Sequence, residues 1–126
     1  MSLLPDITEL LARAHADLRM GVPVVLQGDG EAALAIAAEA LTPERLADLR
    51  GLGAPVVAIT ARRAETLKAR AYDGDLARIE LPRDADGGWV RALADPADDL
   101  ISPMKGPLIS QRGGSAALHR MAIRLA

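Results

Sequence analysis

The sequence predicts a single α/β (α+β) domain in which short buried strands alternate with amphipathic helices. At 126 residues, the chain is long enough for one hydrophobic core and too short for two ordinary domains. Apolar side chains recur at three- and four-residue spacing over residues 6–20, which indicates a helix. Two apolar runs flank the stretch Gln27-Gly28-Asp29-Gly30-Glu31, which indicates two buried strands joined by a tight turn.

The N-terminal elements follow from capping and turn residues. Asp6 is suited to cap the first helix, and Gly21 is suited to end it. Residues 22–26 and 32–37 then form the two strands of a predicted hairpin. Pro23 has no N–H to donate, so we expect it at the start of its strand or on an edge.

The next helix and strand have equally clear signals. Thr42-Pro43-Glu44 combines a capping hydroxyl, a proline for the first helical position and an acid near the positive end of the helix dipole. This helix is expected to run to about Gly51. Residues 55–59 are predicted to form a third buried strand, and Thr60 is predicted to cap a short helix over residues 61–70.

The second half of the chain is less regular. Residues 72–75 form a predicted turn, and the alternating residues 76–81 predict a strand with one solvated face. Residues 83–88 are expected to be a polar loop, residues 89–94 give no assignment, and residues 95–107 are expected to be an extended connection. Ser115 is expected to cap a last helix. That helix has no stop signal before Ala126, so we expect the sequence to continue in a longer protein.

Composition excludes several classes of partner. Lys and Arg total 15 against 17 Asp and Glu, a net charge of -2, and the basic residues are scattered. Such a chain has no electrostatic attraction to a polyanion. It has no Phe, one Trp and one Tyr, so the aromatic platforms on which single-stranded bases stack are also missing. We therefore expect no nucleic-acid partner.

The chain has no cysteine, which excludes disulfides, thiolate chemistry and cysteine-bound zinc. His15 and His119 have no second ligand at metal-binding spacing, so both are expected to be surface or partly packed residues and no metal is expected here. No apolar segment is long enough to span a membrane. These observations predict a cytoplasmic protein with no membrane partner.

Three stretches together resemble dihydroxybutanone phosphate synthase, a riboflavin-pathway enzyme that acts on ribulose 5-phosphate. The stretches follow one another in the family's order and are Leu18-Arg19-Met20-Gly21 before Val24-Val25-Leu26; Ala38-Glu39-Ala40-Leu41-Thr42 before Val56-Val57-Ala58-Ile59-Thr60 and Arg62-Arg63; and Ser102-Pro103-Met104-Lys105-Gly106 before Gln111-Arg112-Gly113-Gly114. The resemblance implies an abbreviated three-layer domain, with a mixed sheet flanked by helices.

The departures from that family concern the groups that perform its chemistry. The family has a long loop with an Arg-Glu-Asn-Glu-Gly core after its first strand, and here Asp29 and Glu31 stand on a short turn instead. The family also has a metal-binding His directly after Arg-Gly-Gly, where this chain has Ser115. Asp29 and Glu31 are thus a possible vestigial acidic loop, and Arg112, Gly113, Gly114 and Ser115 a possible vestigial anion-binding segment. We expect no catalytic residue in this chain.

A reduced domain of this kind precedes the cyclohydrolase in some bacterial GTP cyclohydrolase II proteins, and this chain resembles that arrangement. The resemblance implies an N-terminal, non-catalytic structural or dimerisation domain of a riboflavin-biosynthesis protein. Its expected partners are the C-terminal cyclohydrolase domain of the parent protein and a second copy of itself. Zinc is expected only in that cyclohydrolase part, because the cysteines that hold it are absent here.

Two alternative functions remain open from the residues. One is a residual magnesium-dependent sugar-phosphate enzyme that uses Asp29 and Glu31, since carboxylates and water are the usual ligands of magnesium. The other is a regulatory module that binds a small phosphate ligand through Arg112, Gly113, Gly114 and Ser115, because a helix start presents free N–H groups. Solvated charges in the first case, and a plain capped turn in the second, explain the same residues without any ligand.

Overall fold

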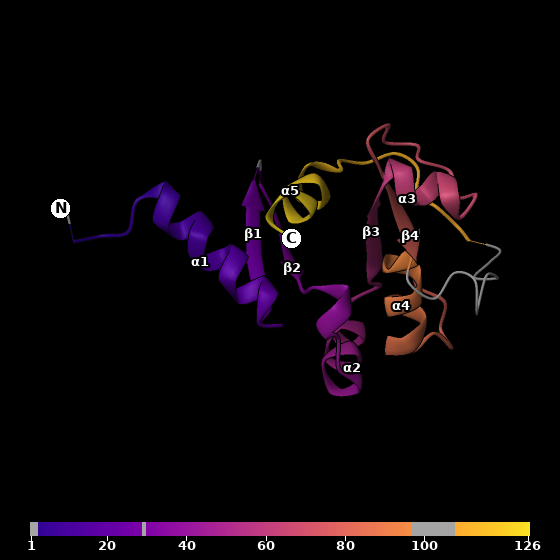
Figure 1. Ribbon diagram of the computed structural model, residues 1–126, viewed down its shortest axis with the longest axis horizontal. Coiled ribbons are helices and arrows are strands. Elements are labelled where there is room, and N and C mark those ends of the chain that lie inside the picture. The colour runs from indigo at the N-terminus through magenta and orange to yellow at the C-terminus, as the bar shows by residue number, and fades with distance from the viewer. Residues whose placement is uncertain (1–2, 29, 97–107) are drawn as a thin grey trace.

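The computed structural model describes residues 3–28, 30–96 and 108–126 of the chain. Its helices are α1 (Ile7–Arg19), α2 (Pro43–Leu52), α3 (Ala61–Thr66), α4 (Gly87–Ala94) and α5 (Ala117–Leu125), with a short 3-10 helix, η1 (Ala38–Ala40). Its strands are β1 (Val24–Gly28), β2 (Glu31–Ala35), β3 (Val56–Thr60) and β4 (Leu76–Glu80). This mixture of helices and antiparallel strands confirms the α+β class (Figure 1).

The first helix forms as the sequence predicts. The Asp6 side chain accepts a hydrogen bond from the N–H of Glu9 at 2.8 Å, and the Glu9 carboxylate accepts one from the N–H of Asp6 at 3.2 Å. This capping box pairs amides that would otherwise lack partners at the helix start. Gly21 has a φ of +84°, and the left-handed conformation ends the helix as expected.

The hairpin is confirmed. β1 and β2 are antiparallel, and Gly28 pairs with Glu31 across a two-residue connection. Gly30 in that connection has a φ of +78°, which glycine adopts at little cost. Pro23 lies directly before β1, where a missing N–H breaks no pairing. The strands begin and end within two residues of the expected ranges.

The helices in the middle of the chain are capped by the predicted hydroxyls. Thr42 accepts from the N–H of Arg45, and Thr60 accepts from the N–H of Arg63, each at 3.2 Å. The second of these helices, α3, is shorter than the expected residues 61–70. It ends at Thr66 because Lys68 adopts a φ of +59°, a left-handed conformation that does not continue a helix.

Two further expectations for the second half are wrong. Residues 87 and 88, the end of the expected polar loop, form α4 together with the unassigned residues 89–94, and Asp86 caps this helix by accepting from the N–H of Trp89 at 2.9 Å. The N-cap of α5 is Ala116 rather than Ser115, whose hydroxyl accepts from the N–H of Ala117 at 3.2 Å. The extended connection expected over residues 95–107 falls almost entirely outside the described residues.

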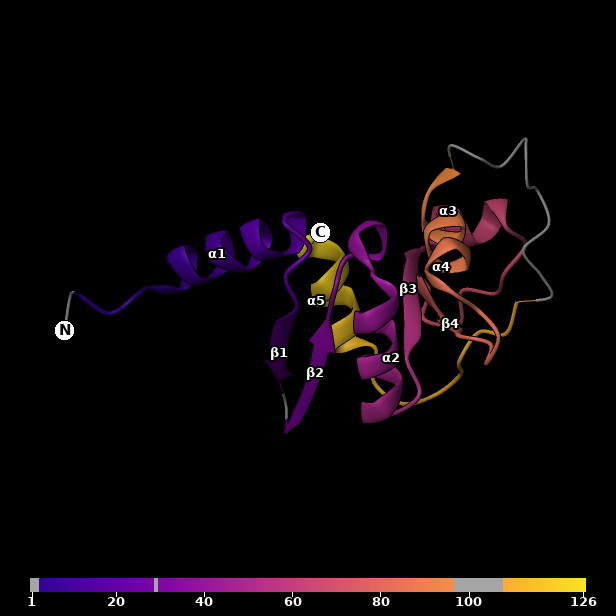
Figure 2. The same cartoon turned by 90° about the horizontal axis from the view of Figure 1, so that it is seen from below.

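The described strands form two separate antiparallel pairs, β1–β2 and β3–β4, rather than one mixed sheet. Figure 1 shows α5 between the two pairs, and Figure 2 shows α2 near the same gap from another side. α5 packs against β1, β2 and β3, and Leu118 on this helix is buried together with Leu18, Val24 and Leu26. A helix therefore holds the two strand pairs together.

The remaining core lies around the second strand pair. One cluster joins β3 and β4 to α3 and α4, and another joins α2 and η1 to α4. The buried members of the first are Ile59, Ala64, Ala77, Ile79 and Leu93, and those of the second are Leu41, Leu46 and Val90. Val57 and Trp89 contact both clusters, so α4 packs on one continuous apolar region.

Candidate functional site

The centre of β4 carries a buried charge. Arg78 is only 4% exposed, so the solvated face expected for this strand is wrong. Its guanidinium donates two hydrogen bonds to the Asp73 carboxylate, at 2.9 and 3.0 Å, and a third to the carbonyl of Gly113 at 2.7 Å. A buried charge is tolerated when it is paired and hydrogen-bonded in this way. Arg78 therefore links its strand to the segment that precedes α5.

That segment is the Arg-Gly-Gly-Ser stretch selected from the sequence. Gly113 and Gly114 have φ values of +74° and +69°, so the chain reverses there through two left-handed residues. The Arg112 guanidinium lies over the Tyr72 ring, 4.5 Å from its centre, which is within the range of a cation–π interaction. The Arg112 side chain and the Gly113 carbonyl of this segment thus both contact other residues of the domain, Tyr72 and Arg78.

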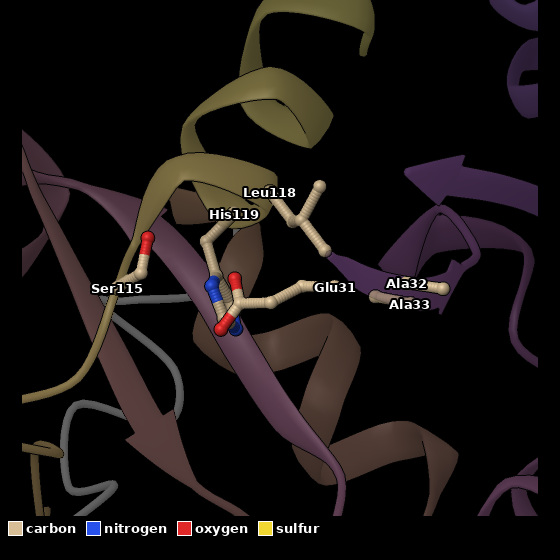
Figure 3. Close-up of a pocket in the computed structure, with 6 residues that line it drawn as sticks. All are labelled: Glu31, Ala32, Ala33, Ser115, Leu118 and His119. Atoms are coloured by element: carbon tan, nitrogen blue, oxygen red, sulfur yellow. The ribbon is translucent and has the colours of Figure 1, made fainter. Parts of the chain in front are cut away.

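A polar cleft lies where the hairpin meets the start of α5. It has a volume of about 310 Å³ and is lined by Glu31, Ala32, Ala33, Ser115, Leu118 and His119. Figure 3 shows Glu31 reaching from β2 toward His119, with Ser115 on the neighbouring side. The fold thus brings Glu31 of the acidic turn and Ser115 of the anion-binding segment into one cleft. Asp29, the other acidic residue of that turn, lies outside the described residues.

His119 is the residue of this cleft that sequence reasoning did not select as functional. Its side chain is partly buried, as expected, but Nδ1 is fully enclosed, and no hydrogen-bond partner for this atom is found among the described residues. Burial lowers the pKa of His119 below its ordinary value of 6.5, and the nearby Arg78 lowers it further, whereas the carboxylates of Asp73 and Glu31 act in the opposite direction. The imidazole is therefore neutral at pH 7.

The cleft offers a carboxylate, a hydroxyl and a neutral imidazole. These groups can accept and donate hydrogen bonds to a polar ligand, and a neutral imidazole can also accept a proton. Within residues 3–28, 30–96 and 108–126, no three His, Cys, Asp or Glu side chains are grouped closely enough to hold a metal ion. No sequence signal identified His119, because Glu31, the charged residue that it meets in the cleft, comes from β2, far away in the chain.

Arg63 and His15 have structural contacts instead. His15 Nδ1 lies 2.6 Å from the carbonyl oxygen of Leu125, which ties α1 to the end of α5. Arg63 on α3 donates to the carbonyl of Leu93 at 2.9 Å and to that of Ala92 at 3.1 Å, so it holds the C-terminal end of α4. Such bonds pair carbonyls that helix geometry leaves without partners.

The fold and the cleft together define an α+β domain with a small polar cleft at a hairpin–helix junction. The chain is 38% identical over 88 residues to the GTP cyclohydrolase-2 of Azospirillum brasilense, a stretch that makes up 67% of this chain and 23% of that protein. The chain thus spans about a quarter of the length of the curated relative it matches, and it is related to one part of a GTP cyclohydrolase II protein.

No family model matches the chain, and no solved structure matches it. Of the helices that the structure describes, none is long and apolar enough to cross a lipid bilayer.

Proposed function

We propose that this chain is a non-catalytic, synthase-like structural domain of a riboflavin-biosynthesis protein whose GTP cyclohydrolase II activity resides elsewhere in the polypeptide. The similarity to GTP cyclohydrolase-2 carries this proposal, because it covers 67% of the chain but only 23% of the relative. Its role is to pack against the cyclohydrolase part of the parent protein, to form a homodimer, or both.

The geometry around Arg112 supports a structural role for the Arg-Gly-Gly-Ser segment. Arg112 stacks on Tyr72, the Gly113 carbonyl accepts from Arg78, and the Ser115 hydroxyl accepts from the N–H of Ala117. The Arg112 guanidinium and the Ser115 hydroxyl, which a bound phosphate would need, are therefore used to hold the turn and the start of α5, and the Gly113 carbonyl anchors the same turn. A segment with these contacts serves the fold whether or not a ligand is bound.

Exposed apolar side chains support a role in association. α1 projects from the rest of the molecule, as Figures 1 and 2 both show. Leu4, which precedes α1, is 66% exposed. On α1 itself, Ile7 is 68% exposed, and Leu10 and Leu11 are nearly half exposed. Apolar groups gathered on one surface are typical of a region that a partner covers.

The complete protein encoded by the gene provides the test. We expect it to convert GTP, and we expect Glu31→Ala and Ser115→Ala to leave kcat and KM for GTP unchanged. The chain of residues 1–126 is expected to leave ribulose 5-phosphate unconsumed in the presence of magnesium. A large loss of kcat with either variant, or turnover by the chain alone, would contradict a non-catalytic role.

A second candidate function rests on the cleft that joins Glu31, Ser115 and His119. The convergence of three polar groups favours a small polar ligand such as a sugar phosphate, bound for regulation or for residual magnesium-dependent chemistry. Ribulose 5-phosphate with magnesium should then raise the melting temperature of the wild-type chain, and the rise should increase with the ligand concentration. Glu31→Ala should abolish the rise. An unchanged melting temperature at millimolar concentrations of both compounds would exclude this candidate.

A further inference from the structure

A second, larger cavity separates the two strand pairs. This groove has a volume of about 740 Å³ and is lined by residues 32–39, which include most of β2, and residues 53–60, which include all of β3. Its remaining lining is mostly apolar and includes Leu118, Ala122 and Ile123 of α5. Figures 1 and 2 both place β2 and β3 as the inner strands of their pairs, so that the two strands face each other across the gap.

The hydrogen bonds of β4 show which backbone groups of β3 point into the groove. The carbonyl of Arg78 accepts from Gln111, and the N–H of Glu80 donates to Ile109, so residues 78 and 80 face the segment at residues 109–111. Since backbone groups alternate along a strand, Ile79 and Ala77 must face β3, where they pair with Val57 and Ile59. Ala58 therefore directs its N–H and C=O away from β4 and into the groove.

The hairpin register gives the same result for β2. Gly28 and Glu31 flank the two-residue connection, so they form the hydrogen-bonded pair next to the turn. Every second pair along the ladder is then hydrogen-bonded, and Leu34 lies in an alternate pair, opposite Val25. Leu34 thus points its N–H and C=O away from β1, toward β3. Among the described residues, β2 pairs only with β1, and β3 only with β4.

We propose that this groove receives one extended strand of the same polypeptide and that this strand joins β2 and β3 into one sheet. The strand comes from a part of the polypeptide that corresponds to the unmatched portion of the longer relative. This inference rests on the proposed function. Within the part of the chain that the structure describes, the backbone groups that Leu34 and Ala58 direct into the groove have no strand partner. They match an extended backbone, whereas a helix pairs its own backbone groups. The apolar floor formed by α5 suits a strand with apolar side chains on one face.

The same polypeptide is the source because the matched relative has about three quarters of its length outside the matched region. A strand on the same chain docks at a high effective concentration, so a short strand is sufficient. The strand would also explain how two separate two-stranded sheets, which are weak units alone, are stabilised in the complete protein.

Amide hydrogen exchange gives a direct test with internal controls. In the chain of residues 1–126, Val57 and Ile59 should exchange slowly because they pair with β4, whereas Ala58 and Leu34 should exchange fast. In the complete protein, all four amides should be protected, with exchange at Ala58 and Leu34 slowed by more than about tenfold.

Each other pattern of exchange has a distinct meaning. If the domain associates with the rest of the protein while Ala58 and Leu34 still exchange fast, the strand proposal fails and the proposed function stands. If the domain does not associate at all, both fail. Protection of Ala58 that appears in residues 1–126 alone and grows with concentration would mean that a second copy fills the groove, which overturns the proposed source.

Substitution at Ala58 in the complete protein tests the same contact. Ala58→Pro removes the N–H that faces the groove and leaves the hydrogen bonds between β3 and β4 intact. We expect Ala58→Pro to abolish the protection of Leu34 while Val57 and Ile59 remain protected. The matched control, Ala58→Val, keeps the N–H and should preserve all protection.

Undiminished protection of Leu34 in Ala58→Pro would overturn the proposal. If Ala58→Pro does not fold, Leu34→Pro tests the opposite wall, because its side chain is 42% exposed and its N–H makes no bond to β1. Loss of protection at Ala58 in that variant supports strand addition, and unchanged protection overturns it.

Discussion

Arg78 places a positive charge inside the strand pair, and two partners make that possible. Its side chain is 5% exposed and that of Asp73 is 11% exposed, and they form a bidentate ion pair. The Gly113 carbonyl accepts a third hydrogen bond, so the charge also holds the turn before α5. The alternation of residues 76–81 predicts a solvated side chain at Arg78. No sequence motif links Arg78 to Asp73 or to Gly113, so the sequence did not indicate that these residues would enclose its charge.

We expect Arg78→Met to lower the free energy of unfolding by about 3–5 kcal/mol, because the substitution leaves Asp73 buried without its cation. Urea denaturation measures the change. Arg120→Met is the control, since its partner Asp75 and Arg120 itself are 54% and 37% exposed, and water replaces the lost contact. Similar losses in the two variants would contradict the distinction between buried and exposed pairs.

His119 should make the stability depend on pH. Burial, and next the charge of Arg78, lower the pKa of His119 in the folded state below the value of 6.5, while Asp73 and Glu31 oppose this shift. Between the folded pKa and 6.5, the unfolded chain binds more protons, so the free energy of unfolding falls as the pH falls through this window. Urea midpoints at about pH 7 and about pH 5 should therefore differ less in His119→Gln than in the wild type. Equal pH dependence in the two proteins would exclude His119 as the cause.

At the scale of single elements, local signals located most helix starts. Asp6, Thr42 and Thr60 cap their helices as predicted, because each cap depends only on residues three positions away. α4 escaped prediction because it begins with two glycines and is short. Its stability comes instead from burial of Val90 and Leu93 against other elements.

Gly21 and Gly30 provide a matched comparison of two left-handed glycines. A Cβ at Gly21 would lie 2.8 Å from the Cβ of Ala40, whereas one at Gly30 would meet no atom within 4 Å. Both alanine variants should lose about 1–2 kcal/mol from the left-handed backbone, and Gly21→Ala should lose more because α1 and η1 must move apart. Chemical denaturation checks this order, and an equal loss in both variants would show that the contact yields without cost.

At the scale of the molecule, α5 unites elements that are far apart in the sequence. It packs against the hairpin, α1 and β3, and it lines both the polar cleft and the groove between the strand pairs. Its apolar spacing predicted one buried face, and Leu118, Met121, Ala122 and Leu125 all pack in the cluster with the hairpin. That the helix would also separate two strand pairs was not visible in the sequence.

Leu118→Ala should lower the free energy of unfolding by about 2–5 kcal/mol, because it leaves a cavity at the junction of α1, α5 and the hairpin. The side chain of Leu118 is 6% exposed. Leu34→Ala on β2 is the control, with an expected change of about 0.5 kcal/mol or less in the chain of residues 1–126, since Leu34 is 42% exposed there. Thermal and urea unfolding measure both, and a small effect at Leu118 would contradict its place in the core.

The sequence by itself determined the α+β class, the hairpin and most helix starts, because capping, turn chemistry and apolar spacing act over a few neighbouring residues. It also selected Glu31 and Ser115 as residues of interest. Only the tertiary structure decided that these two residues share one cleft with His119, that Arg78 is buried, and that β2 and β3 face a common groove. Those features depend on contacts between residues far apart in the chain, and no local pattern encodes such distances.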